Sequence, residues 1–115
     1  MKFNDAEVTA SALTGLIYAE FNGTSKLNAS ADLTIANVTV VGGELELMGT
    51  SEIEITKFIV NEGAVVGWES ALTLAGSIYN YGEMYFNAGT VTATCYNAGG
   101  EYFGTEAWPT LQPMP

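Results

Sequence analysis

The sequence contains no histidine and no arginine, and only three lysines stand against 13 acidic residues. Without histidine, the commonest general base and metal ligand of proteins is missing. Without arginine, no side chain can hold a carboxylate or phosphate through two parallel hydrogen bonds. The net charge of −10 also disfavours anionic partners, because nucleic acids and anionic membranes are bound through Lys and Arg. We therefore expect neither a nucleic-acid nor a membrane partner.

Cysteine and long apolar segments are also scarce. Cys95 is the only cysteine, so the fold does not rely on an internal disulfide. With no histidine to activate it, we expect Cys95 to be a small core residue rather than a nucleophile. No run of about 18 apolar residues exists, and residues 1–5 lack the pattern of a signal peptide. If the chain is complete, we expect it to be made and folded in the cytosol.

Strand-forming residues and glycines are abundant. Of the 115 residues, 48% are hydrophobic and 13 are glycine, a mixture typical of short strands separated by tight turns. This length suits a single domain with one modest core. The composition therefore predicts an all-β domain.

The turns recur at a regular spacing. Asn-x-Gly occurs at residues 61–63, 80–82 and 97–99, and Gly42-Gly43 and Asn22-Gly23 precede them at similar intervals. These positions divide the chain into coils of 17–20 residues that begin at residues 22, 42, 61, 80 and 97. Apolar residues at matching places are expected to form core ranks: Leu33, Ile53, Leu72 and Val91; Ile35, Ile55 and Leu74; Leu27, Leu47, Val66, Tyr85 and Tyr102; Val40, Ile59, Ile78 and Cys95.

Alternation with period two within each coil places one set of side chains inside and the other outside. A single coil cannot bury its inner face, whereas stacked coils form a continuous core. We therefore predict a parallel β-solenoid of about five coils. One alternative is an antiparallel meander or sandwich with a hairpin around Gly49-Thr50, and another is a β-helix intertwined from three chains.

The ends differ from the coils. Residues 1–21 precede the clear repeat and are expected to be an N-terminal cap or attachment segment, while residues 22–107 form the coils. Residues 108–115 contain three prolines, which end a ladder of backbone hydrogen bonds, so they are expected to be a C-terminal cap and extended tail.

Aromatic residues concentrate in the last two coils. Neighbouring residues alternate between inside and outside, so these side chains cannot all be buried. Exposed aromatics in a patch suggest an interface, although ordinary stacking along a sheet is an equal explanation. The candidate interface residues are Tyr79, Tyr81, Phe86, Tyr96 and Phe103.

Carboxylates are the only plausible catalytic groups. Glu52 and Glu54 lie two residues apart and should share an outer face, with Asp32 in the rank beside them. Paired carboxylates can hydrolyse glycosides or bind Ca²⁺, but a solvated outer face is the better interpretation. We expect no catalytic, cofactor-binding or metal-binding residues.

With the coils aligned, residues 22–107 resemble the right-handed parallel β-helix adhesins of the filamentous-haemagglutinin kind, which also have repeats near 19 residues with Asn and Gly at the corners. Short acidic β-helices also resemble modules of bacteriophage fibres, spikes and capsid decoration proteins. The resemblance rests on pattern and carries over no functional residues. The second group implies a homo-oligomer, commonly a trimer, that needs no chemistry and assembles in the host cytoplasm.

The expected function is therefore that of a non-enzymatic structural protein at the surface of a virion, where it joins copies of itself and a larger assembly such as a capsid. The alternative is an extracellular adhesin or carbohydrate-binding repeat at a cell surface. Glycans are a further candidate partner, because exposed tyrosines can stack on sugar rings.

Overall fold

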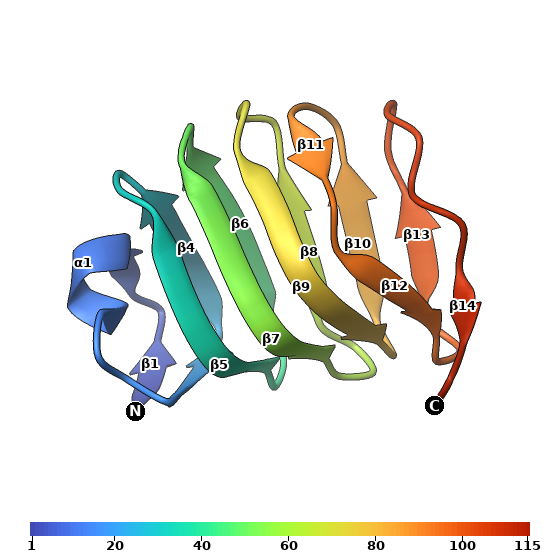
Figure 1. The fold of residues 1–115 in the computed structure, drawn as a ribbon. Coiled ribbons are helices and arrows are strands. Elements are labelled where there is room, and N and C mark those ends of the chain that lie inside the picture. Colours follow the sequence, from blue (N-terminus) through green and yellow to red (C-terminus); the bar gives the residue numbers. More distant parts are fainter.

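The chain winds into a stack of turns with two parallel sheets facing each other (Figure 1). The computed structural model describes all 115 residues. Every strand pair is parallel and joins a strand to one about a turn away in sequence. β6 and β7 belong to different sheets and form no hairpin, which excludes the antiparallel alternative. The prediction of a parallel β-solenoid is confirmed, and one chain supplies both sheets and the core between them.

The first sheet contains eight strands: β1 (Lys2–Asn4), β3 (Tyr18–Asn22), β5 (Leu33–Val40), β7 (Glu52–Val60), β9 (Thr73–Asn80), β11 (Thr90–Val91), β12 (Thr94–Asn97) and β14 (Gln112–Pro113). The second contains six: β2 (Glu7–Thr9), β4 (Thr24–Ala29), β6 (Glu44–Gly49), β8 (Val65–Trp68), β10 (Glu83–Phe86) and β13 (Glu101–Phe103). Since each turn gives one strand to the second sheet, the stack has six turns.

The additional turn, beyond the five predicted, comes from the N-terminal segment. β1 pairs with β3 and β2 pairs with β4, so residues before Asn22 extend both sheets. The short helix α1 (Ala10–Leu13) follows β2 and buries Ala10 and Leu13 against the core. This segment therefore adds a turn and covers one end of the stack.

At the opposite end the core is closed by an aromatic side chain. The Trp108 ring packs edge-on against the rings of Trp68, Phe86 and Tyr102, at centroid distances of 5.8, 5.3 and 4.8 Å. Its indole N–H donates a hydrogen bond to the Phe103 carbonyl at 2.7 Å. Beyond it, β14 pairs with β12. The residues from 108 onward thus cover the last turn.

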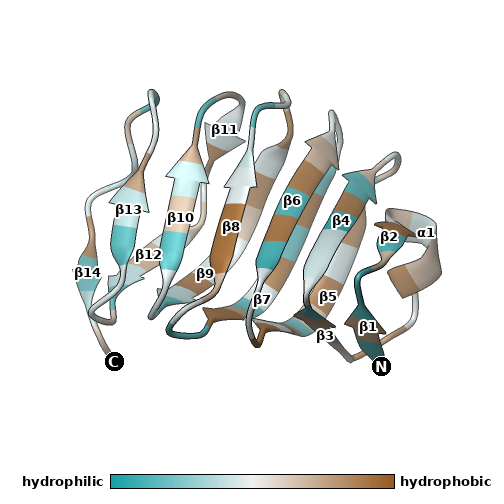
Figure 2. Cartoon of the chain, turned by 180° about the vertical axis from the view of Figure 1, so that it is seen from behind, coloured by the Kyte–Doolittle hydropathy of each residue, from teal (hydrophilic) through white to brown (hydrophobic).

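The alternation along each strand builds the core. In β5, β7 and β9, buried and more exposed residues largely alternate. On the second sheet, Figure 2 shows hydrophilic and hydrophobic residues alternating along β6. Six of the seven residues of the first two predicted ranks are buried: Leu33, Ile35, Ile53, Ile55, Leu72 and Leu74. Val91 packs against this core half-buried. The one helix, α1, has four residues, whereas a membrane-spanning helix needs about 20.

The registers differ from the predicted ranks at several positions. Ile53 pairs with Leu74 rather than with Leu72, and Val66 pairs with Met84 rather than with Tyr85. Ile59 pairs with Tyr79 on the outer face, while Phe58 pairs with Ile78 inside. The physical reason is that coil length is not constant, and that β7 and β9 shift register between Ile55 and Phe58. A slip of one residue exchanges the inner and outer faces of a strand.

Candidate functional site

The aromatic residues predicted to form one patch are divided between two faces and a corner. Tyr79 and Tyr96 lie on the outer face of the first sheet and stack with ring centroids 4.8 Å apart. Phe103 lies on the outer face of the second sheet and stacks on Tyr85 at 5.0 Å. Tyr81 is exposed in the corner between β9 and β10. The two stacked pairs therefore face opposite directions.

Phe86 does not belong to any exposed patch, and its inclusion in the predicted interface was wrong. Its side chain is buried and its ring lies 5.5 Å from that of Trp68. Because Met84, and not Tyr85, points inward from β10, Phe86 also points inward two residues later. Tyr85 consequently lies outside, opposite to the core position predicted for it.

Tyr81 and Tyr96 border different hollows. Tyr81 borders a corner hollow together with Glu62, Glu83 and Glu101. Tyr96 borders a separate hollow beneath the C-terminal segment, beside Pro109 and Gln112. The two tyrosines therefore lie at different sites.

The outer face of the first sheet carries a short row of large side chains. Ile59, Tyr79 and Tyr96 occupy paired positions on β7, β9 and β12, and we call them the aromatic rank. The ammonium nitrogen of Lys57 lies 5.6 Å from the centroid of the Tyr79 ring, a cation–π arrangement. This face thus combines an apolar row with a cation of its own.

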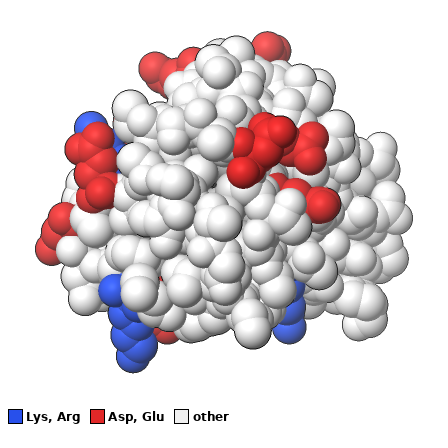
Figure 3. Space-filling model, turned by 60° about the vertical axis from the view of Figure 1, so that its left-hand side comes forward, with Lys and Arg blue, Asp and Glu red and all other residues white.

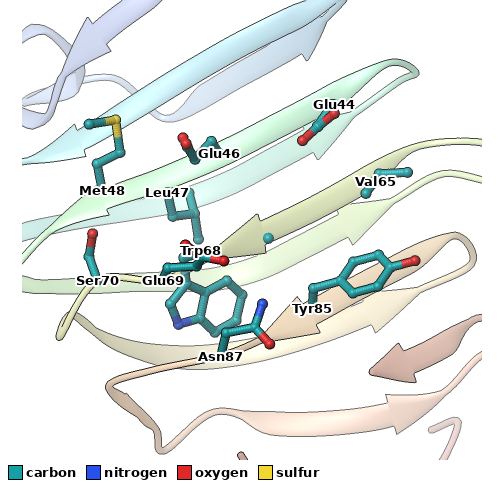
Figure 4. Close-up of a pocket in the computed structure, with 11 residues that line it drawn as sticks. Glu44, Glu46, Leu47, Met48, Val65, Trp68, Glu69, Ser70, Tyr85 and Asn87 are labelled. Carbon is teal, nitrogen blue, oxygen red and sulfur yellow. The ribbon is translucent and has the colours of Figure 1, made fainter. Parts of the chain in front are cut away.

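The outer face of the second sheet is hollowed over β8. Residues Glu46, Gly67 and Tyr85 occupy paired positions on β6, β8 and β10, so Gly67 leaves a gap between two side chains. The hollow has a volume of about 530 Å³, and we call it the Gly67 hollow. Figure 4 shows Glu44 and Glu46 along one side of it and Tyr85 along the other. Further lining residues are Val65, Glu69, Ser70 and Asn87.

Tyr85 is held in a carboxylate-rich environment. Its hydroxyl donates a long hydrogen bond of 3.5 Å to Oε2 of Glu83. Loss of hydration at the sheet surface, with the negative charges of Glu83 and Glu101, raises the pKa of the Tyr85 phenol. A tyrosine phenol is already neutral at physiological pH, and the raised pKa lets it keep its proton for a hydrogen bond in more alkaline solution as well.

Carboxylates dominate the charged surface (Figure 3). Glu52 and Glu54 lie on the outer face of β7, as their spacing predicts. Asp32 has a structural role, because its Oδ1 accepts a hydrogen bond of 2.9 Å from the Glu52 backbone N–H. No group of three or more acidic or cysteine side chains converges in a way that could hold a metal ion.

Cys95 is completely buried among apolar side chains on β12, opposite Ile78 of β9. Its thiol lies 3.8 Å from the Ala93 carbonyl oxygen. Burial raises the pKa of the Cys95 thiol from 9.0 to about 11. Since the thiolate is the reactive form, the structure keeps this group inert.

We expect thiol reagents to leave Cys95 almost unmodified in the folded protein. At pH 8, a pKa two units higher lowers the thiolate fraction about 100-fold relative to the unfolded chain. The measurement is the rate of Ellman's reagent labelling with and without urea. Equal labelling rates would contradict the burial of Cys95.

The same pKa shift affects the pH dependence of stability. Because the pKa of Cys95 is raised in the folded protein, the stability contributed by the protonated thiol is complete below pH 9.0 and is lost as pH rises through about 11.

Sequence reasoning did not single out Gly67, Trp68 or Lys57. Trp68 is buried, and its indole N–H donates a hydrogen bond of 2.9 Å to the Ala88 carbonyl. The signal was present in Val65-Val66-Gly67-Trp68, where alternation places residues 66 and 68 inside and the glycine outside. An outward glycine within a strand marks a close approach or a gap.

No protein-family model, curated protein or solved structure shows a significant match to this chain.

Proposed function

We propose that this protein is a non-enzymatic structural component of a virion surface, such as a fibre, spike or capsid decoration, and that it works as a homo-oligomer, with a trimer favoured. The observation that carries the proposal is the aromatic rank on the outer face of the first sheet. Ile59, Tyr79 and Tyr96 form an ordered row with polar neighbours such as Thr39 and Ser77. Aromatic residues at the centre and polar residues at the rim are typical of protein interfaces.

Charge favours the same face for self-association. At a net charge of −10, two copies repel each other, so they should meet where negative charge is least concentrated. Lys2 and Lys57, two of the three lysines, lie on the strands of the first sheet, and Lys2 lies 3.9 Å from Glu20. On the second sheet a single lysine, Lys26, accompanies five glutamates: Glu7, Glu44, Glu46, Glu83 and Glu101. The strands of the first sheet carry three glutamates, Glu20, Glu52 and Glu54, so the first sheet is the less repulsive contact surface.

The covered ends also support assembly through a face. α1 and Trp108 close the two ends of the core, and the edge strands β1, β2, β13 and β14 are only two or three residues long, so end-to-end pairing of exposed strands is hindered. Oligomers with closed symmetry instead repeat one side surface around an axis. A parallel sheet of eight strands offers such a surface.

We expect light scattering to give the molar mass of an oligomer for the unmodified protein and of a monomer for Tyr79→Asp. Losing a central tyrosine and adding a buried charge should cost about 2 kcal/mol or more at each interface. The matched control is Tyr85→Asp, which removes the tyrosine of the other stacked pair and adds the same charge on the opposite face. This control should remain oligomeric.

Two outcomes would contradict the proposal. One is an unmodified protein that stays monomeric at millimolar concentration. The other is equal dissociation of Tyr79→Asp and Tyr85→Asp, which would show a general charge effect rather than an interface at the aromatic rank.

A further inference from the structure

The two stacked aromatic pairs differ in what lies beside the ring of Tyr79 in one pair and of Tyr85 in the other. On the first sheet, Tyr79 stacks on Tyr96, and Lys57 covers the Tyr79 ring. On the second sheet, Tyr85 stacks on Phe103 with a similar interplanar angle of 24°, but its neighbour on the next strand is Gly67. The chain therefore supplies a cation for one ring, whereas Gly67 and the outward side chain of Val65 are the neighbours of the other on β8.

The space beside Tyr85 is large enough to admit a flat group, although at Gly67 itself an added Cβ would lie 3.3 Å from the Tyr85 Cβ. β6 and β10 lie on either side of β8, so two strand spacings of about 4.8 Å separate Glu46 from Tyr85. Gly67 has no side chain between them, and a hollow of about 530 Å³ results. One flat group in van der Waals contact with the Tyr85 ring would occupy the missing place in this row (Figure 4).

The charges around the Gly67 hollow favour a positively charged ligand. Glu44, Glu46 and Glu69 line it, and Glu83 accepts the hydrogen bond of the Tyr85 hydroxyl. No lysine lines it, and the one salt bridge of the chain, between Lys2 and Glu20, lies on the other sheet. These carboxylates form no salt bridge within the chain, and one lysine, Lys26, stands beside Glu46 at the paired position on β4.

We propose that the Gly67 hollow binds the guanidinium group of an arginine from a partner protein. Guanidinium is planar and positively charged, stacks on aromatic rings and pairs with carboxylates through two parallel hydrogen bonds. Stacked on Tyr85, it would take the place that Lys57 has over Tyr79. The negative charge of Glu46 would lie on its other face, and its N–H groups, which lie in its own plane, would be directed at the other carboxylates that line the hollow. The chain has no arginine, so the guanidinium must come from another protein.

This inference rests on the proposed role in a larger assembly and identifies the chemistry of the attachment partner. The hollow lies on the second sheet and the aromatic rank on the first, so an oligomer joined through the first sheet would keep its hollows available. Each copy would then present one acidic site to an arginine-bearing surface.

The test is an NMR titration of the full chain with N-acetyl-arginine amide at low salt. We expect shifts at the amides of Gly67 and Tyr85, a dissociation constant in the millimolar range, and weakening as salt rises. N-acetyl-citrulline amide has the same shape without the charge and should bind about tenfold more weakly or not at all. Equal binding of the two probes would overturn the proposal.

Variants locate the site. Glu46→Gln and Tyr85→Leu should each weaken binding about five- to tenfold, whereas Glu54→Gln, a matched change on the opposite sheet, should leave it unchanged. Melting curves verify that each variant folds. Unchanged binding in both Glu46→Gln and Tyr85→Leu would overturn the proposal, and so would shifts produced by methyl glucoside but not by the arginine probe, which would assign the hollow to sugars.

The result is independent of the oligomer experiment. If the protein proves monomeric but binds the arginine probe at Gly67, self-association fails and the hollow remains a cation site. If it is oligomeric and binds neither probe, the hollow proposal fails alone.

Discussion

Gly76→Ala is expected to abolish or nearly abolish folding, at a cost of at least about 4 kcal/mol. Gly76 lies in β9 with φ of +104°, a region that residues with a side chain rarely adopt. A Cβ atom there would overlap the carbonyl oxygen of Ile55 on the neighbouring turn, which is backbone and cannot rotate away. The backbone at this point also carries the register shift between β7 and β9.

Gly63→Ala is the matched control. Gly63 also has a positive φ, +85°, but an added Cβ would meet nothing within 4 Å. The free energy of unfolding of Gly63→Ala should therefore fall by only about 1–2 kcal/mol, the cost of holding an alanine at a positive φ. Urea unfolding followed by circular dichroism measures both. Similar losses for the two variants would show that the close approach of neighbouring turns at Gly76 does not determine stability.

Trp68→Ala should destabilise the protein by about 3–5 kcal/mol, the usual cost of removing a large buried ring. Trp68 is among the largest fully buried side chains and contacts both Phe86 and the Trp108 ring. The substitution also leaves the Ala88 carbonyl without its indole partner. The cavity left by the indole ring would separate the core side chains that hold the last turns together.

Trp108→Ala is the comparison for this prediction. Trp108 is half-buried at the end of the stack, so its removal exposes the last turn without forming an enclosed cavity. We expect about half the loss of Trp68→Ala, measured by the same urea titration. A larger loss for Trp108→Ala would mean that the end cap, rather than the central packing, limits stability.

The fold class followed from the sequence because two signals agreed. The recurrence of Asn-x-Gly fixed the length of a turn, and alternation in segments such as Leu33-Thr34-Ile35 and Ile53-Glu54-Ile55 fixed which residues face inside. Those four inward residues are buried and paired as predicted, Leu33 with Ile53 and Ile35 with Ile55. Here successive turns have equal length, so counting from the corners works.

The predicted core ranks were wrong where successive turns differ in length. Val66 follows its partner Leu45 by 21 residues but precedes its partner Met84 by 18. A fixed offset from the corner therefore chose Tyr85, whose side chain points outward, and placed Phe86 outside although it is buried. Corner insertions change sequence spacing without disturbing strand pairing, and no propensity of a single residue records them.

The candidate sites depended on these same registers. The exposed positions of Tyr79, Tyr96 and Phe103 could be anticipated from alternation, but their division between two faces could not. The Gly67 hollow required knowing that Glu46, Gly67 and Tyr85 align across three turns. Such an alignment is a property of the stack rather than of any short motif.

The uniform connection of each turn only to its neighbours also determines how the molecule forms. Every strand pairs with a strand roughly twenty residues away in sequence. The loss of conformational entropy on closing the loop is therefore similar for each added turn, and no strand pair joins distant parts of the chain. Two turns must associate before any inner face is covered, after which growth proceeds turn by turn in either direction. The long strands β5, β7 and β9, which share the most extensive ladders, are the natural nucleus, and opening should begin at β1 and β14.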